Sequence, residues 1–151
     1  VYRKGVMVGF DGRHTRAHIY RSILEGIAFT VKNHMDGMNR ALDTPLKQLV
    51  VSGGGANSDL FMQIFADIFG VPASRNRMRG SAALGCVINA GMAVGAFSSY
   101  EQAVARMVRK ADQFLPDPEH THTYHQINER VYRHVNRHFD PILKDLSSLV
   151  D

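Results

Sequence analysis

Leu49-Val50-Val51-Ser52-Gly53-Gly54-Gly55-Ala56-Asn57-Ser58 is the stretch of sequence that decides the fold. Its apolar start predicts a short buried strand, and three consecutive glycines end that strand. The residues that follow, 58–69, are amphipathic with a helical period, and Asn57 or Ser58 is a natural N-cap for such a helix. The apolar residues of this segment are Leu60, Phe61, Ile64, Phe65, Ile68 and Phe69. The stretch therefore predicts a strand, a glycine turn and a helix.

The glycine turn has two interpretations. Glycine has no Cβ, so its backbone adopts positive φ readily and lets a flat or anionic ligand lie against it. The helix N-terminus adds free N–H groups and a partial positive charge, and the combination suits a nucleotide. The same glycines also fit a tight structural turn that binds nothing. Their spacing matches neither the Walker lysine loop nor the spaced dinucleotide fingerprint.

Hydrophobic periodicity predicts an α/β arrangement for the rest of the chain. A strand is expected at 5–10, the central strand at 48–52 and a short extended segment at 72–74, all in one sheet. Helices are expected over 15–41, 58–69, 81–96, 100–110 and 121–146. The connection from the first strand through the long helix to the second strand is expected to be right-handed.

Two of these helices carry apolar stripes that are expected to face the core. In helix 15–41, with Thr15 as its cap, the stripe consists of Ile19, Ile23, Ile27, Val31, Met35 and Met38. In helix 121–146 it consists of Tyr124, Ile127, Val131, Val135, Phe139, Ile142 and Leu146. Arg21 and Glu25 are four residues apart in the first helix, so they can form a surface ion pair, and a catalytic role is the alternative interpretation.

Composition narrows the class of protein. The chain has 151 residues and 44% hydrophobic residues, enough for one globular domain with a core. Eighteen Lys and Arg against fourteen Asp and Glu give a net charge of +4, but the basic residues are scattered and do not predict a nucleic-acid partner. No secretory leader or membrane-spanning run is evident. Cys86 is the one cysteine of the sequence, so it has no partner for an intramolecular disulfide. We therefore expect a reduced, cytoplasmic setting without membrane contact, and Cys86 packed as a small apolar residue.

Histidines and arginines offer weaker candidate sites. His134 and His138 have the i, i+4 spacing of a metal pair, but no Cys or matching carboxylate accompanies them. A surface cluster is the simpler interpretation for this pair, and also for His120, His122 and His125. No metal ligands are therefore assigned. A Ser-His-Asp hydrolase is not indicated, because no G-x-S-x-G occurs.

The loop after the segment 72–74 carries three arginines, Arg75, Arg77 and Arg79. These side chains could bind phosphate, but a solvated loop is the preferred interpretation.

Three segments resemble one known family. The segment Ser52–Ser58 with Met62–Pro72 resembles the adenosine-binding region of the FGGY carbohydrate kinases. Arg16–Ala28 is similar to the arginine-to-Leu-Glu-Gly helix of that family, and Ala83-Leu84-Gly85-Cys86 resembles its Ala-Leu-Gly-Ala helix. Order and spacing agree over nearly the whole chain. One difference is the loop 75–79, where the family usually carries acidic residues.

The resemblance implies an actin-like, ribonuclease H-like ATPase fold with a mixed sheet flanked by helices, of which this chain is the C-terminal part. The first strands of the motif would lie upstream, so residues 1–151 would form a single nucleotide-binding lobe of a longer sugar kinase. It further implies ATP with Mg²⁺, adenosine held by Gly53, Gly54, Gly55 and Ser58, and transfer of the γ-phosphoryl group to a sugar or polyol. The phosphate motif, the catalytic aspartate and most sugar contacts would belong to the missing lobe. No catalytic residue is assigned to this chain, and the isolated chain is expected to be inactive.

A second class of function stays open at this point. A non-catalytic actin-like interaction domain would keep the same fold and a homodimer surface without the chemistry. An Asp-Gly-Thr loop and a general-base aspartate upstream would favour the kinase. The identity of the acceptor is not encoded in these residues.

Overall fold

The computed structural model describes residues 5–78 and 80–150. The elements in chain order are α1 (Arg16–Leu42), β1 (Leu49–Val51), the 3₁₀ turn η1 (Gly54–Asn57), α2 (Asp59–Phe69), β2 (Ala73–Asn76), α3 (Ser81–Ala93), α4 (Tyr100–Met107), β3 (Lys110–Phe114), α5 (Pro118–Ile127), the π-helical turn η2 (Asn128–Tyr132) and α6 (Arg133–Val150). The strands form one mixed sheet in the order β1-β2-β3, in which β1 and β2 are parallel and β3 is antiparallel to β2. The predicted pairing of 48–52 with 72–74 in one sheet is confirmed. None of the helices in the described part of the chain is long and apolar enough to cross a membrane.

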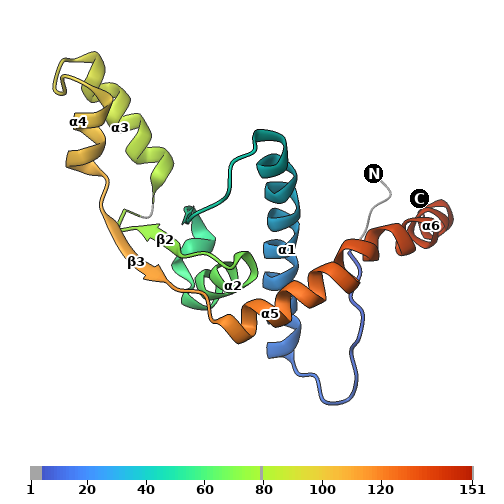
Figure 1. Ribbon diagram of the computed structural model, residues 1–151. Helices are drawn as coiled ribbons and strands as arrows, with labels where there is room; N and C mark the ends of the chain where they lie inside the picture. The colour runs from blue at the N-terminus through green and yellow to red at the C-terminus, as the bar shows by residue number, and fades with distance from the viewer. Residues whose placement is uncertain (1–4, 79, 151) are drawn as a thin grey trace.

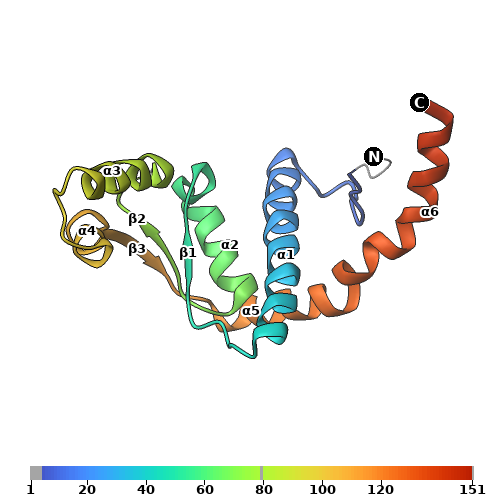
Figure 2. The same ribbon diagram turned by 90° about the horizontal axis from the view of Figure 1, so that it is seen from above.

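Helix α2 lies between the sheet and α1, and Figure 2 shows these three layers side by side. Eight of its eleven residues are buried, because the helix is covered on one side by the strands and on the other by α1 and α5. The core consists mainly of Met62, Ile64, Phe65, Ala66, Ile68 and Phe69 from α2, with Ala28 and Phe29 from α1, Ala73 from β2 and Tyr124 from α5. The helix predicted over 58–69 is therefore the centre of the domain.

Helices α3 and α4 form a hairpin that extends away from this core (Figure 1). They bury a small cluster of their own, Leu84, Ile88 and Ala103. Cys86 is exposed, so the prediction that it packs as an apolar residue is wrong. The reason is that only one side of α3 is covered by α4, and Cys86 lies on another side. The helices also end earlier than predicted, at Ala93 and Met107.

Residues 5–10 form no strand, contrary to the prediction. The sheet is separated from this segment by α2 and α1, so no strand in the described part of the chain lies beside it (Figure 2). An isolated extended segment has no neighbouring strand with which to share backbone hydrogen bonds. The predicted right-handed crossover from this strand is absent for the same reason.

The stripe predicted to face the core in α1 is largely exposed. Ile19, Ile23, Ile27, Val31 and Met38 are 39–55% exposed, and only Met35 contacts the core. The side of α1 that packs against α2 carries Leu24, Ala28 and Phe29 instead. The residues 5–10 and this stripe together leave an apolar surface on the side of α1 opposite α2.

The C-terminal half differs from the prediction in two ways. Residues 110–114 form β3, although their polar sequence gives little sign of a strand, and Lys110 begins that strand instead of ending a helix. The predicted helix 121–146 is interrupted at η2, and a π-helical turn adds a residue per turn and shifts every later side chain around the helix axis. After η2 the buried side chains are Leu143 and Ser147, whereas the predicted Ile142 and Leu146 are 58% and 43% exposed. Before and within η2, Asn128 is buried, and Ile127 and Val131 are 40% and 51% exposed.

A buried phenol ties α5 to α1. Arg21 and Glu25 form the predicted ion pair at 2.8 Å, and Tyr124 bridges them by accepting from Arg21 Nη2 at 2.9 Å and donating to Glu25 Oε1 at 2.7 Å. Burial raises the pKa of the Tyr124 phenol to about 12, the bond to Glu25 acts in the same direction, and Arg21 opposes the shift. The pair is thus part of the contact between two helices and more than a surface feature.

Replacing Tyr124 with Phe should lower the free energy of unfolding by roughly 2 kcal/mol, because Arg21 and Glu25 each lose a buried partner. The folded-state pKa of Tyr124 lies above its unfolded value, so its contribution is complete below about pH 10 and is lost as the pH rises through about 12. Chemical denaturation at neutral and alkaline pH measures both effects. The exposed Tyr20 gives the control, Tyr20→Phe. Equal stability of Tyr124→Phe and wild type would contradict the bridging role.

Candidate functional site

The glycine loop joins β1 to α2 at the end of two parallel strands. Gly53 has φ 95° and ψ −173°, a conformation essentially restricted to glycine, and it turns the chain out of β1. Two backbone bonds then close the 3₁₀ turn, from Ala56 N to Gly53 O at 3.2 Å and from Ser58 N to Gly55 O at 3.1 Å. The loop is therefore a defined turn, and its positive φ belongs to the first of the three glycines.

The other two glycines have different surroundings. A Cβ placed on Gly54 would meet no described atom within 4 Å, so this peptide faces open space. A Cβ placed on Gly55 would lie 2.5 Å from Cε1 of Phe61, closer than real Cβ contacts. Gly55 is thus required by packing within the protein, whereas the exposed backbone of Gly53 and Gly54 can be approached from outside.

The N-terminus of α2 follows the loop. Ser58 is its N-cap, as one of the two predicted candidates, and its hydroxyl accepts from Phe61 N at 3.3 Å. The first helical residue is Asp59, whose carboxylate places negative charge at a helix end that would otherwise attract anions. This arrangement favours an uncharged part of a ligand beside the loop over a phosphate group.

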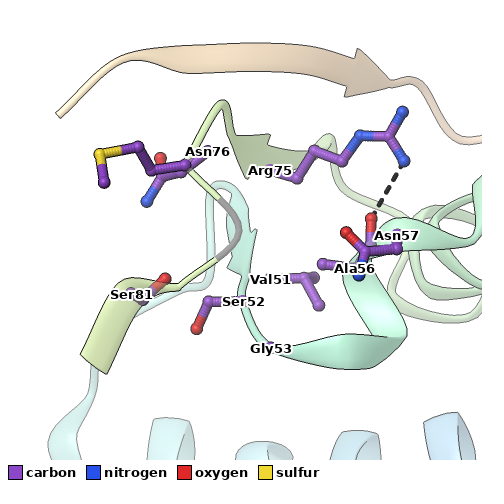
Figure 3. Close-up of a pocket in the computed structure, with 9 residues that line it drawn as sticks. Val51, Ser52, Gly53, Ala56, Asn57, Arg75, Asn76 and Ser81 are labelled. Carbon is purple, nitrogen blue, oxygen red and sulfur yellow. Dashed lines mark hydrogen bonds between the residues drawn. The ribbon is translucent and has the colours of Figure 1, made fainter. Parts of the chain in front are cut away.

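A small hollow opens beside the loop, and Figure 3 shows that β1, the glycine turn, β2 and the start of α3 surround it. Its lining residues are Val51, Ser52, Gly53, Ala56, Asn57, Arg75, Asn76, Met78 and Ser81. It therefore combines open backbone, hydroxyl and amide groups with an apolar wall. With a volume of about 10 Å³ the hollow has room for about one water molecule, so it lies at the edge of the loop and does not itself enclose a ligand the size of a nucleoside. Sequence reasoning missed Asn76, Met78 and Ser81, which approach the loop only through the sheet and the α3 connection.

Arg75 was predicted in a solvated loop, and this prediction is wrong. It lies in β2, directly opposite Val51 of β1, with 19% of its side chain exposed. Its guanidinium forms ion pairs with two carboxylates. Nε donates to Asp112 at 2.8 Å, and Nη1 lies 2.8 Å from Asp59. Hydrogen bonding to Asp112 first, and to Asp59 second, raises the pKa of Arg75 above its ordinary value. Arg77 N donates to Arg109 O at 2.7 Å, and Arg79 lies outside the described residues.

The candidate histidines contact neighbouring protein groups. His120 Nδ1 lies 3.3 Å from Asp67, His134 Nε2 lies 3.1 Å from Glu129 O, and His138 Nδ1 lies 2.8 Å from His134 O. Among residues 5–78 and 80–150, no three His, Cys, Asp or Glu side chains come together in a way that could hold a metal ion.

Comparison with known proteins identifies the family from the sequence and a shared fold from the structure. Residues 2–94 match the C-terminal domain of the FGGY family of carbohydrate kinases. The chain is 44% identical over 143 residues to the uncharacterised sugar kinase YgcE of Escherichia coli, covering 95% of this chain and 29% of that protein. The ligand-bound xylulose kinase of Lactobacillus acidophilus superposes with a TM-score of 0.81 at 20% identity, over 96% of this chain and 29% of that one. The glycerol kinase of Plasmodium falciparum, solved with ADP, gives 0.68 at 25% identity, over 83% and 26%.

The chain therefore belongs to the FGGY family of carbohydrate kinases and corresponds to the C-terminal domain of that family. Its fold is the predicted actin-like ATPase fold, with a three-stranded mixed sheet flanked by helices. The chain spans less than a third of the length of the relatives that it matches.

Gly55→Ala should destabilise the protein, because the added methyl group forces the Phe61 ring out of its position beside η1. Overpacking of this kind costs roughly 1–3 kcal/mol. Gly54→Ala is the matched control, since its methyl group enters open space. Thermal unfolding of the two variants provides the measurement, and equal melting temperatures would show that Phe61 does not restrict the loop.

Proposed function

We propose that this chain is the ATP-binding C-terminal lobe of a carbohydrate kinase that transfers the γ-phosphoryl group of ATP to a hydroxyl group of a sugar or polyol. The observation that carries the proposal is the exposed backbone of Gly53 and Gly54, between the end of β1 and the capped N-terminus of α2. This loop occurs in a chain whose family consists of carbohydrate kinases. Fold and site therefore support one function.

The adenosine part of ATP is the part that we assign to the loop. Gly53 and Gly54 offer a backbone without side chains, Gly55 lets the turn pack closely on Phe61, and Ser58 begins α2. Among the described residues that line the hollow, the one cation is Arg75, and it is already paired with Asp59. We therefore assign the phosphates and Mg²⁺ to residues outside this chain, together with the catalytic base and most sugar contacts.

The exposed apolar surface of α1 supports the proposal that residues 1–151 form one lobe of a longer kinase. Ile23, Ile27 and Met38 are each 46–55% exposed. Met7, Val8 and Phe10 are 42–55% exposed and line one hollow together with Ile23. Apolar residues in such a continuous arrangement normally contact another part of a protein. We propose that the upstream strands of the kinase cover this surface. A homodimer and a cytoplasmic location stay predictions.

Gly54→Val in the whole kinase should raise the KM for ATP by roughly tenfold or more, whereas kcat and the KM for the sugar should change little. The branched side chain stands where the nucleoside approaches the backbone, so the loss is in binding and not in chemistry. Steady-state kinetics with each substrate varied in turn measure the effect.

The variant Gly37→Val serves as the control, because its Cβ also meets no described atom within 4 Å but lies in α1, outside the loop. Melting temperatures of both variants separate binding from folding. If Gly54→Val folds normally and its dependence on ATP equals that of wild type, the triple glycine is only a structural turn, and the assignment of the nucleotide to it is wrong.

Residues 1–151 alone should show no sugar phosphorylation, since no base or phosphate motif is assigned to them. The whole kinase should phosphorylate at least one acceptor in a screen with ATP against glycerol, xylulose, ribulose, fuculose, rhamnulose and gluconate. If residues 1–151 alone phosphorylate a sugar, and Gly54→Val abolishes this activity, the assignment of the catalytic base and the phosphate motif to the other lobe is wrong. A whole protein that binds no ATP and phosphorylates none of these acceptors would instead support a non-catalytic interaction domain.

A further inference from the structure

Arg75 is the side chain that connects the glycine loop to the rest of the sheet. It projects from β2, and its Nη1 donates to the carbonyl oxygen of Ala56 at 3.0 Å, the contact drawn in Figure 3. Ala56 is the buried residue of η1, between the glycines and the N-cap of α2. One guanidinium therefore reaches the backbone of the loop from the neighbouring strand.

Three further contacts fix the position of this guanidinium. The same Nη1 lies 2.8 Å from Asp59 at the start of α2, and Nε donates to Asp112 of β3 at 2.8 Å. The guanidinium also lies over the Phe114 ring, with Cζ 5.3 Å from the ring centroid. Arg75 thus bonds simultaneously to η1, α2 and β3. The planar fork of arginine can satisfy these directions, and a single ammonium group cannot.

We propose that Arg75 is a positioning residue for nucleotide binding, which holds the loop 53–58 in the geometry that receives adenosine. This inference rests on the proposed function of the loop. Arg75 does not act as a phosphate ligand, because Asp59 and Asp112 already neutralise its charge. Its effect on the ligand passes through the Ala56 carbonyl oxygen and the N-terminus of α2. An ångström-scale displacement of a binding group is enough to change rate or affinity strongly.

The test compares three variants in the whole kinase. Arg75→Met removes all the polar contacts of the guanidinium, Arg75→Lys keeps the charge without the fork, and Asp112→Ala removes only the partner in β3. Hydrogen exchange of the amides of residues 54–59 measures the order of the loop directly. Steady-state kinetics measure the KM for ATP, the KM for the sugar and kcat, and melting temperatures report the general loss of stability.

Arg75→Met should accelerate exchange in the loop and raise the KM for ATP by roughly tenfold, with the KM for the sugar unchanged. Arg75→Lys should give a smaller change in the same direction. Asp112→Ala should accelerate loop exchange and raise the KM for ATP less than Arg75→Met does, because Arg75 keeps its contacts with Ala56, Asp59 and Phe114.

Two results would overturn the inference. One is a wild-type KM for ATP in Arg75→Met, whether or not exchange in the loop accelerates. The other is an equal rise in this KM in Asp112→Ala and Arg75→Met, which would trace the effect to sheet stability. A wild-type kinase without saturable dependence on ATP would contradict the proposed function itself, and the exchange data would then decide separately whether Arg75 orders the loop.

Discussion

The burial of α2 on two sides is the constraint on which the rest of the structure depends. Its sheet-facing and α1-facing residues are apolar, so the helix is stable only while both layers are in place. Because α2 is fixed in this position, its N-terminus is held at the end of β1, and the loop between them has little room to vary. The location of the candidate site thus follows from the packing of one helix.

Polar contacts secure both ends of this helix. At the C-terminal half, the carboxylate of Asp67 is 1% exposed and accepts from Gln63 Nε2 at 2.8 Å and from Asp117 N at 2.9 Å. At the N-terminal end, Arg75 pairs with Asp59 and bonds to the loop backbone. A buried carboxylate without hydrogen-bond donors would be strongly unfavourable. Because Asp117 N is one of these donors, Asp67 also holds the connection from β3 to α5 against α2. The apolar layers set where α2 lies, and these polar groups set how its ends meet the neighbouring loops.

The elements with a local signal could be predicted from the sequence. The strand, the triple glycine, the Ser58 cap and α2 were predicted because glycines, capping residues and a 3.6-residue period act within a few positions. The Arg21–Glu25 pair was predicted from its i, i+4 spacing, whereas its bridge to Tyr124 depends on how α1 meets α5. β3 could not be predicted, because Lys110–Phe114 is polar and becomes a strand only by pairing with β2.

Errors about exposure have a common physical origin. Periodicity identifies an apolar face, but it does not identify what covers that face. The stripe in α1 is apolar as predicted and yet exposed, and the phase of the last helix changes at η2, which no residue pattern announced. Arg75 looked like a loop residue because neither Asp59 nor Asp112 is near it in the sequence.

A crystal structure of the whole kinase with bound ADP tests the central claim most directly, namely that the loop between β1 and α2 receives the nucleoside. The account predicts the adenosine against the backbone of Gly53 and Gly54, near the N-terminus of α2, with the diphosphate directed away from Asp59. It also predicts the Arg75–Ala56 bond intact in that complex. Adenosine bound elsewhere, with the hollow beside the glycine loop filled by protein side chains, would contradict the account.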